Sequence, residues 1–205
     1  MDDRKKSVRM VTPFDNLKKY SIILASGSPR RKELLSSIGI EYKVRVIKGI
    51  NESYPANMKA ADIPQFISRK KAATYKPNML HNELIITADT VVAVGNKILG
   101  KPKSKAEAWK MLHLLSGRRH QVITGVTVMT SEREETFAAV SNVYVAKLSD
   151  EEIDYYIETY KPYDKAGAYG IQEWIGMIGV TEIKGSFFNV MGLPVQRLYS
   201  LLKTF

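Results

Sequence analysis

The sequence predicts an α/β protein, because segments with strand character alternate with segments with helix character along the chain. The chain has 205 residues, of which 44% are hydrophobic and 25% are charged. That composition is typical of a soluble globular protein, and the length suffices for a sizeable core. We find no internal repeat and no low-complexity linker.

Each element is predicted from the spacing of its apolar residues, since helical spacing indicates a helix, and apolar runs or alternation indicate a strand. The expected elements in chain order are a strand over 22–26, a helix over 29–38, a strand over 42–47, a helix from 62 to about 75, a strand over 84–94 interrupted at 87–90, a short extended segment over 97–99, a helix from 104 to about 115, strands over 120–130 and 136–147, a helix from 149 to about 160, a short strand near 187–190 and a final helix from about 194.

Residues with known capping preferences mark the ends of these helices. Ser28 suits the N-cap of the first helix and Pro29 its first turn, while Gly39 closes it. Three later helices begin with the pattern of a capping box, at Asp62–Gln65, Ser104–Glu107 and Ser149–Glu152. The polar segment 48–61 either joins two lobes or forms a long active-site loop.

Composition also limits the class of protein. The chain has no cysteine, which excludes disulfides, thiolate metal sites and cysteine nucleophiles. No apolar run approaches the roughly 20 residues that span a bilayer, and no signal core follows the charged N-terminus. We therefore expect a cytoplasmic protein without a membrane partner, with a partly flexible arm over 1–20 and one domain over 21–205.

The net charge of +10 is spread along the chain rather than gathered in one basic tail. Such a charge is compatible with nucleic acid, anionic lipid or a small polyanion as a partner, and also with a solvated surface. The chain lacks RNA-binding aromatic signatures and a basic zipper. We therefore expect no stable nucleic-acid partner.

The stretch Ala25-Ser26-Gly27-Ser28-Pro29-Arg30-Arg31 is the most informative motif. It predicts a strand, a tight loop and a helix that begins with two arginines. Cations oppose the helix dipole at that end and cost stability unless an anion lies among them. A phosphate chain is the simplest such anion. The alternative is a surface cap whose arginines point into water.

Asp89 lies inside an apolar strand, where a carboxylate is costly unless it is paired or binds a metal. It is either a metal ligand or general base, or a residue that caps a neighbouring loop. Lys101, between Gly100 and Pro102, suits a positioned phosphate contact. His120 we interpret as a structural hydrogen-bonding residue rather than a metal ligand.

The segment 164–172, Asp-Lys-Ala-Gly-Ala-Tyr-Gly-Ile-Gln, gathers small residues beside an acid and a lysine. Gln172 offers a donor and an acceptor that suit the edge of a nucleobase. The alternative is a tight structural turn with satisfied polar ends.

These motifs, in this order, resemble the Maf family of nucleoside triphosphate pyrophosphatases from about Ile22 to about Leu202. The resemblance rests on Ser26 to Arg31, Ala88-Asp89-Thr90-Val91, Gly100-Lys101-Pro102, Leu115-Ser116-Gly117, Asp164 to Gln172, Gly185-Ser186 and Gly192-Leu193-Pro194. It implies an α/β fold of the inosine triphosphatase-like type, with a mixed, twisted sheet and flanking helices that form two lobes around a cleft.

The resemblance also implies hydrolysis of the bond between the α- and β-phosphates, with Mg²⁺ or Mn²⁺ as cofactor. It assigns catalytic roles to Asp89, Glu52 and Lys101, metal binding to Glu52 and Asp89, and substrate binding to Ser26, Arg30, Arg31, Lys71, Thr90 and Gln172. Asp89 acts as general base, as metal ligand or as both. Lys70 stands beside Lys71, so either lysine matches the family position.

The intact segment 164–172 is similar to members that act on dTTP, UTP and modified uridine triphosphates in nucleotide-pool cleaning, as homodimers. One alternative is a pyrophosphatase for 7-methyl-GTP or another modified purine nucleotide. A second is a noncatalytic nucleic-acid-binding regulator of cell division, which the charge of +10 favours. Asp89 and Glu52 argue against the regulator, because carboxylates facing a phosphate backbone weaken binding without a metal.

Overall fold

Seven strands form one mixed sheet in the computed structural model, which describes residues 12–205. The strands are β1 (Ser21–Leu24), β2 (Lys43–Val44), β3 (Glu83–Val94), β4 (Lys97–Leu99), β5 (Arg119–Met129), β6 (Glu134–Val145) and β7 (Val180–Lys184). Their order is β2-β1-β3-β5-β6-β7, and β4 pairs with β3. β1 runs parallel to β2 and β3, and the remaining pairs are antiparallel. The predicted mixed α/β architecture is confirmed.

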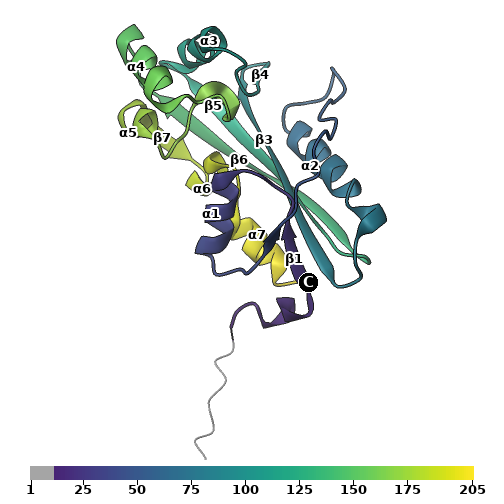
Figure 1. Cartoon of the computed structure of the whole chain (residues 1–205). Helices are drawn as coiled ribbons and strands as arrows, with labels where there is room; N and C mark the ends of the chain where they lie inside the picture. The colour runs from purple at the N-terminus through teal and green to yellow at the C-terminus, as the bar shows by residue number, and fades with distance from the viewer. Residues whose placement is uncertain (1–11) are drawn as a thin grey trace, which may run out of the picture.

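Helices cover both faces of this sheet (Figure 1). They are α1 (Pro29–Ser37), α2 (Ile63–Ala73), α3 (Lys105–Leu115), α4 (Asp150–Tyr160), α5 (Trp174–Gly179), α6 (Phe187–Met191) and α7 (Val195–Leu202), with short 3-10 helices η1 (Asp15–Lys19), η2 (Lys76–Asn78) and η3 (Ala166–Ala168). α2 lies on one face, and α1, α6 and α7 lie on the other, while α3, α4 and α5 gather at one end (Figure 1).

The long central strand β3 directs its side chains alternately to the two faces. Ile85, Val91 and Ala93 pack in the two smaller apolar clusters, which contain residues of α2. Leu84, Ile86 and Val92 belong to the main core on the other face. By the same alternation Asp89 points to the side of α2 and Thr90 to the side of α1.

Gly125 on β5 lets α2 approach the sheet closely. A Cβ atom at this position would lie 2.3 Å from the carbonyl carbon of Pro64, well inside contact distance. The missing side chain therefore sets how near the first turn of α2 lies to the strand that pairs with β3.

Several predicted elements differ from those observed. The strand expected over 42–47 is only Lys43–Val44, because the next residue, Arg45, turns its guanidinium to the Glu83 carboxylate at the start of β3. The expected interruption at 87–90 does not occur, since β3 pairs with β5 continuously through those residues.

The helix caps agree only in part with those that the sequence predicts. The box at Ser149 forms completely, whereas Ser104 accepts its bond from the Glu107 amide and the Glu107 carboxylate accepts one from the Lys103 amide. Asp62 stands before α2 without a side-chain cap bond, and the side-chain amide of Gln65 donates to Ala61 O. The predicted capping box there is therefore wrong. α2 ends at Ala73, earlier than expected.

The prediction of a strand near 187–190 is wrong, because that segment is the helix α6. Ser186 caps it by accepting a bond from the Asn189 amide, and Gly192, with φ of 115°, ends it. Phe and Val suggested a strand, but a five-residue helix is too short to show helical spacing. α5 and β7, which have six and five residues, were not predicted.

Residues 12–20, assigned to the N-terminal arm, contact the C-terminal helix. Leu17 is buried in the main core, Phe14 packs edge-on against Tyr199, and the Asn16 amide donates to Leu202 O. The rest of the predicted arm, residues 1–11, lies outside the described residues, and the division at residue 20 stays a prediction. None of the helices in residues 12–205 has the length and apolar character to cross a membrane.

Candidate active site

A cleft of about 470 Å³ opens where β1, β3, α1 and α2 meet the segment 164–172. This volume lies within the range of small-molecule sites. Its lining includes every residue that the sequence predicted for the site, namely Ser26, Arg30, Arg31, Glu52, Lys71, Asp89, Thr90, Lys101 and Gln172. Gly49, Ile50 and Glu52 contribute to the lining, so the polar segment 48–61 is a cleft loop.

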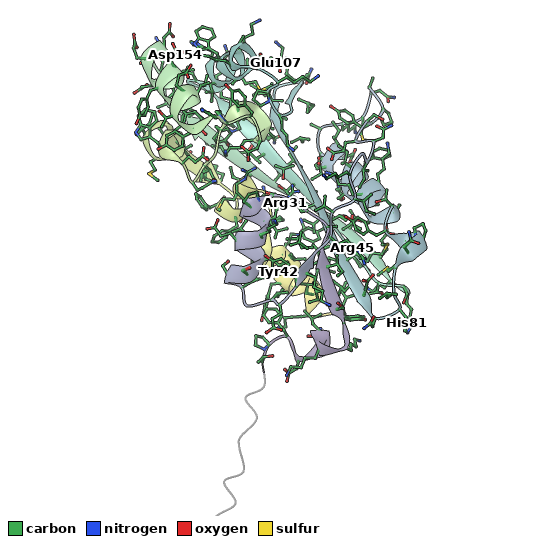
Figure 2. All side chains as sticks on the ribbon, in the orientation of Figure 1. Arg31, Tyr42, Arg45, His81, Glu107 and Asp154 are labelled. Carbon is green, nitrogen blue, oxygen red and sulfur yellow. The ribbon has the colours of Figure 1, made fainter. Side chains whose placement is uncertain are left out.

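Arg31 joins three segments of the cleft wall, and Figure 2 shows it where α1 meets the sheet. Its Nε donates to Gly192 O at 2.9 Å, and its Nη1 donates to Ala88 O at 2.9 Å and Ser26 Oγ at 3.4 Å. Its Nη2 donates to Thr90 Oγ1 at 3.1 Å. Four of the five guanidinium donors thus bind protein oxygens. Burial lowers the pKa of Arg31 below its ordinary value.

Arg30 bridges the cleft to the segment 164–172. Its Nη1 lies 2.7 Å from Asp164 Oδ2, and Asp164 Oδ1 lies 2.8 Å from Lys165 Nζ. Burial raises the pKa of Asp164, but the hydrogen bonds from Lys165 and Arg30 outweigh it and lower the pKa overall. The anion beside this arginine of the first helical turn is therefore the Asp164 carboxylate. A phosphate has to compete with this carboxylate for Arg30.

Lys71 brings the two predicted acidic residues together. Its Nζ lies 2.8 Å from Asp89 Oδ1 and 3.0 Å from Glu52 Oε1. Asp89 is only 9% exposed, and this ion pair explains how β3 holds a carboxylate among apolar residues. Lys70 instead reaches Ser53 O from the exposed surface. The geometry therefore selects Lys71 from the two adjacent lysines as the cleft residue.

Lys101 and Gln172 also line the cleft. The position of Lys101 is fixed through its neighbour, because Gly100 O accepts a bond from the Gly167 amide at 3.0 Å. The side-chain oxygen of Gln172 is buried and has no hydrogen-bond partner among residues 12–205. An unpaired buried acceptor is costly, so the protein gains free energy when a donor reaches this oxygen.

Tyr169 forms part of the wall, and its hydroxyl lies 2.7 Å from Nε2 of His120. The His120 side chain is buried, and burial lowers its pKa to about 4, so the imidazole is neutral at pH 7. The prediction that His120 is a structural hydrogen-bonding residue is confirmed.

The cleft attracts anions, since five cationic side chains and three carboxylates line it. Glu52 and Asp89 converge on one ammonium group and offer hard oxygen donors. Mg²⁺ is usually bound by one or two carboxylates together with substrate phosphates, and this pair fits that pattern. No group of three or more acidic or histidine residues within the described chain forms a metal site by itself.

Sequence reasoning missed several lining residues. Asp164 and Lys165 belong to a segment that was singled out, but its spacing does not reveal that Arg30 reaches Asp164 across the cleft. Tyr169 and Gly192 enter the lining through tertiary packing. The small residues gathered around them indicate that another segment approaches the backbone closely, but they do not show which segment it is.

Along most of its length this chain is similar to proteins of one family. A protein-family model described as Maf-like protein matches residues 21–205. A protein named dTTP/UTP pyrophosphatase from Parabacteroides distasonis is 58% identical over 192 residues, which are 94% of this chain and 100% of the relative. One of the same name from Phocaeicola vulgatus is 60% identical over 190 residues, 93% and 98% of the two chains. The solved structure of a HAM1 protein from Coxiella burnetii has a TM-score of 0.49 at 14% identity, covering 91% of this chain and 100% of that chain.

Proposed function

This chain belongs to the Maf-like protein family, and we propose that it hydrolyses the α–β phosphate bond of dTTP and UTP. The products are the nucleoside monophosphate and pyrophosphate. The observation that carries the proposal is the cluster of Lys71, Asp89 and Glu52 in a cleft lined mainly by cations. Such a cleft binds a polyphosphate and keeps a carboxylate beside the scissile bond.

Hydrolysis of a polyphosphate depends mainly on positioning and on neutralising charge. The ammonium of Lys71 has three donors, of which two face carboxylates, so one remains for a phosphate oxygen. Arg30 and Lys101 supply further positive charge along the cleft. Ser26 and Arg31 shape the wall, because their polar groups bind each other and the adjacent backbone.

Asp89 acts as the general base in this proposal. The oxygen of a water molecule bonds to the α-phosphorus, and its proton passes to the Asp89 carboxylate. The bond between the α-phosphorus and the bridging oxygen breaks, and that oxygen leaves with pyrophosphate. Lys71, 2.8 Å from Asp89 Oδ1, holds the carboxylate in place for this transfer.

Glu52 and Asp89 are also the residues that would hold Mg²⁺ or Mn²⁺, because their oxygens suit a hard cation. A bound divalent cation would neutralise charge on the phosphate oxygens. Removing the metal with a chelator should abolish turnover, and adding Mg²⁺ or Mn²⁺ back should restore it. Full activity in excess chelator would contradict this assignment.

Gln172 is the proposed reader of the base. Uracil and thymine present an N–H donor beside a carbonyl acceptor, and the carboxamide offers the complementary acceptor and donor. Its unpartnered oxygen is the acceptor in this pairing. Substituents at C5 leave that edge unchanged, so we include modified uridine triphosphates among the substrates and nucleotide-pool cleaning as the role.

We further propose a homodimer. Met177 and Phe187 are exposed and line a shallow apolar groove with Ile183, beside the outer strand β7. Sedimentation should give about twice the chain mass of 23.1 kDa. A single species of chain mass at working concentration would contradict the dimer.

A substrate panel tests the activity itself. Pyrophosphate release is measured for dTTP, UTP, CTP, GTP, ATP and 7-methyl-GTP with Mg²⁺ or Mn²⁺. We expect release mainly from dTTP and UTP. Release only from the methylated purine nucleotide would contradict the substrate class, and release from none of them would contradict the enzyme.

A further inference from the structure

A largely buried polar network lies beside the turn that carries Gln172, and the reaction described above does not use it. It consists of Tyr156 from α4, together with Lys165, Gly170 and Glu173 from the segment around Gln172; we call it the Glu173 network. The Tyr156 ring is completely buried, and Lys165 is only 7% exposed. Polar groups this deep in a protein are costly unless they are fully paired.

The Glu173 carboxylate is the centre of this network. The Tyr156 hydroxyl donates to Glu173 Oε2, and Lys165 Nζ lies 3.0 Å from Glu173 Oε1. The Tyr156 oxygen in turn accepts a bond from the Gly170 amide at 3.0 Å. Burial, followed by the bond to Glu173, raises the pKa of Tyr156 and keeps the hydroxyl protonated as a donor.

This network fixes the turn that presents Gln172 to the cleft. The Glu173 amide donates to Gly170 O at 3.0 Å, so Gly170 and Glu173 are joined through their backbones as well as through Tyr156. A Cβ atom at Gly170 would lie 2.7 Å from the Glu173 side chain, so the packing is tight. Gln172 lies between these two anchored residues.

We infer that Glu173 is a positioning residue for Gln172, and that Tyr156 and Lys165 hold its carboxylate so that the Gln172 carboxamide meets the base edge. The inference rests on the proposed reading of the base by Gln172. Lys165 is also bonded to Asp164, which pairs with Arg30, so the network continues to the phosphate side of the cleft.

Steady-state kinetics with a double-mutant cycle test the inference. The variants are Glu173→Ala, Gln172→Ala and the pair together, with Glu182→Ala on β7 as the control, since Glu182 is exposed and pairs only with Lys184 among the described residues. We expect Glu173→Ala to raise the KM for dTTP about tenfold and to leave kcat within about twofold, because one base contact is lost. The preference for dTTP over CTP should also fall in the Glu173→Ala variant.

In the Gln172→Ala background, Glu173→Ala should change the KM by less than about twofold. The conservative Glu173→Gln keeps an acceptor for the tyrosine and should hold the KM for dTTP within about threefold of wild type. If Glu173→Ala fails to fold, Tyr156→Phe removes a single hydroxyl and enters the same cycle with Gln172→Ala.

Equal effects of Glu173→Ala with and without the Gln172 side chain would overturn the inference, as would an equal loss for dTTP and CTP. Either result would make the network a purely structural support of the turn. A wild-type protein without activity on dTTP would contradict the proposed function instead, so the two failures are distinguishable.

Discussion

The ammonium of Lys71 lies 2.8 Å from Oδ1 of Asp89, so a helix on one face of the sheet delivers a cation to a carboxylate on the central strand. The same ammonium lies 3.0 Å from Glu52. Three residues that are far apart in the sequence therefore form one charged cluster.

Lys71→Ala should lower kcat/KM for dTTP about 100-fold, because it removes both a phosphate donor and the partner of Asp89. Lys70→Ala is the matched control, since Lys70 bonds to Ser53 O at the surface and has no carboxylate partner among residues 12–205. Its kcat/KM should stay within about twofold of wild type. Pyrophosphate release measures both, and a larger loss for the Lys70 variant would refute the assignment.

Asp89→Asn should lower kcat about 1,000-fold, which is in the range of a lost general base. The amide keeps the shape of the side chain, and Glu52 still pairs with Lys71. We therefore expect the variant to stay folded and to bind nucleotide in a calorimetric titration. Turnover at the wild-type rate would exclude Asp89 from the mechanism.

Arg31→Lys should destabilise the fold, because an ammonium cannot replace a guanidinium that binds four oxygens from three segments. We expect the free energy of unfolding in urea to fall by about 2 kcal/mol. Arg30→Lys provides the comparison, since its partner Asp164 is largely exposed and such pairs contribute about 1 kcal/mol or less. Similar stabilities for the two variants would contradict the claim that Arg31 holds these three segments together.

His120 should make the fold less stable in acid. The folded pKa is about 4, below the ordinary value of 6.5, so between these values the unfolded chain binds a proton that the folded chain does not. The free energy of unfolding should therefore fall as pH drops from 6.5 to 4, by at most about 3 kcal/mol from this group. His120→Gln should flatten this part of the stability curve.

The control for that measurement is the same pair of proteins between pH 7.5 and 9, where His120 is neutral in both the folded and the unfolded chain. In that range the stability curves of wild type and His120→Gln should run parallel. An unchanged slope between pH 6.5 and 4 in the His120→Gln variant would show that another group causes the acid sensitivity.

The sequence was sufficient to predict elements whose signal is local. The long apolar strand, the capped helix after Ser149 and the final helix all carry their own periodicity and end residues. α6 was misread as a strand because Phe187, Phe188 and Val190 favour strands, whereas the Ser186 cap and the left-handed Gly192 decide the local structure. A segment of five residues is too short for helical periodicity to be recognised in the sequence.

Motifs and the family resemblance predicted residues that line the cleft, but not the partners of these residues. The alternation of β3 explains why Asp89 meets Lys71 and Thr90 meets Arg31, yet this needs the helices to be assigned to faces first. The pairing of Arg30 with Asp164 joins residues 134 positions apart, and no local pattern encodes it. The Glu173 network depends in the same way on the packing of α4 against the Gln172 loop.

Hydrolysis of dTTP in ¹⁸O-labelled water, with mass spectrometry of the products, tests the central claim most directly. Attack on the α-phosphorus predicts one labelled oxygen in dTMP and none in pyrophosphate. The Asp89→Asn variant should form both products far more slowly than wild type. Label in pyrophosphate, release of dTDP with inorganic phosphate, or no hydrolysis at all would contradict the account.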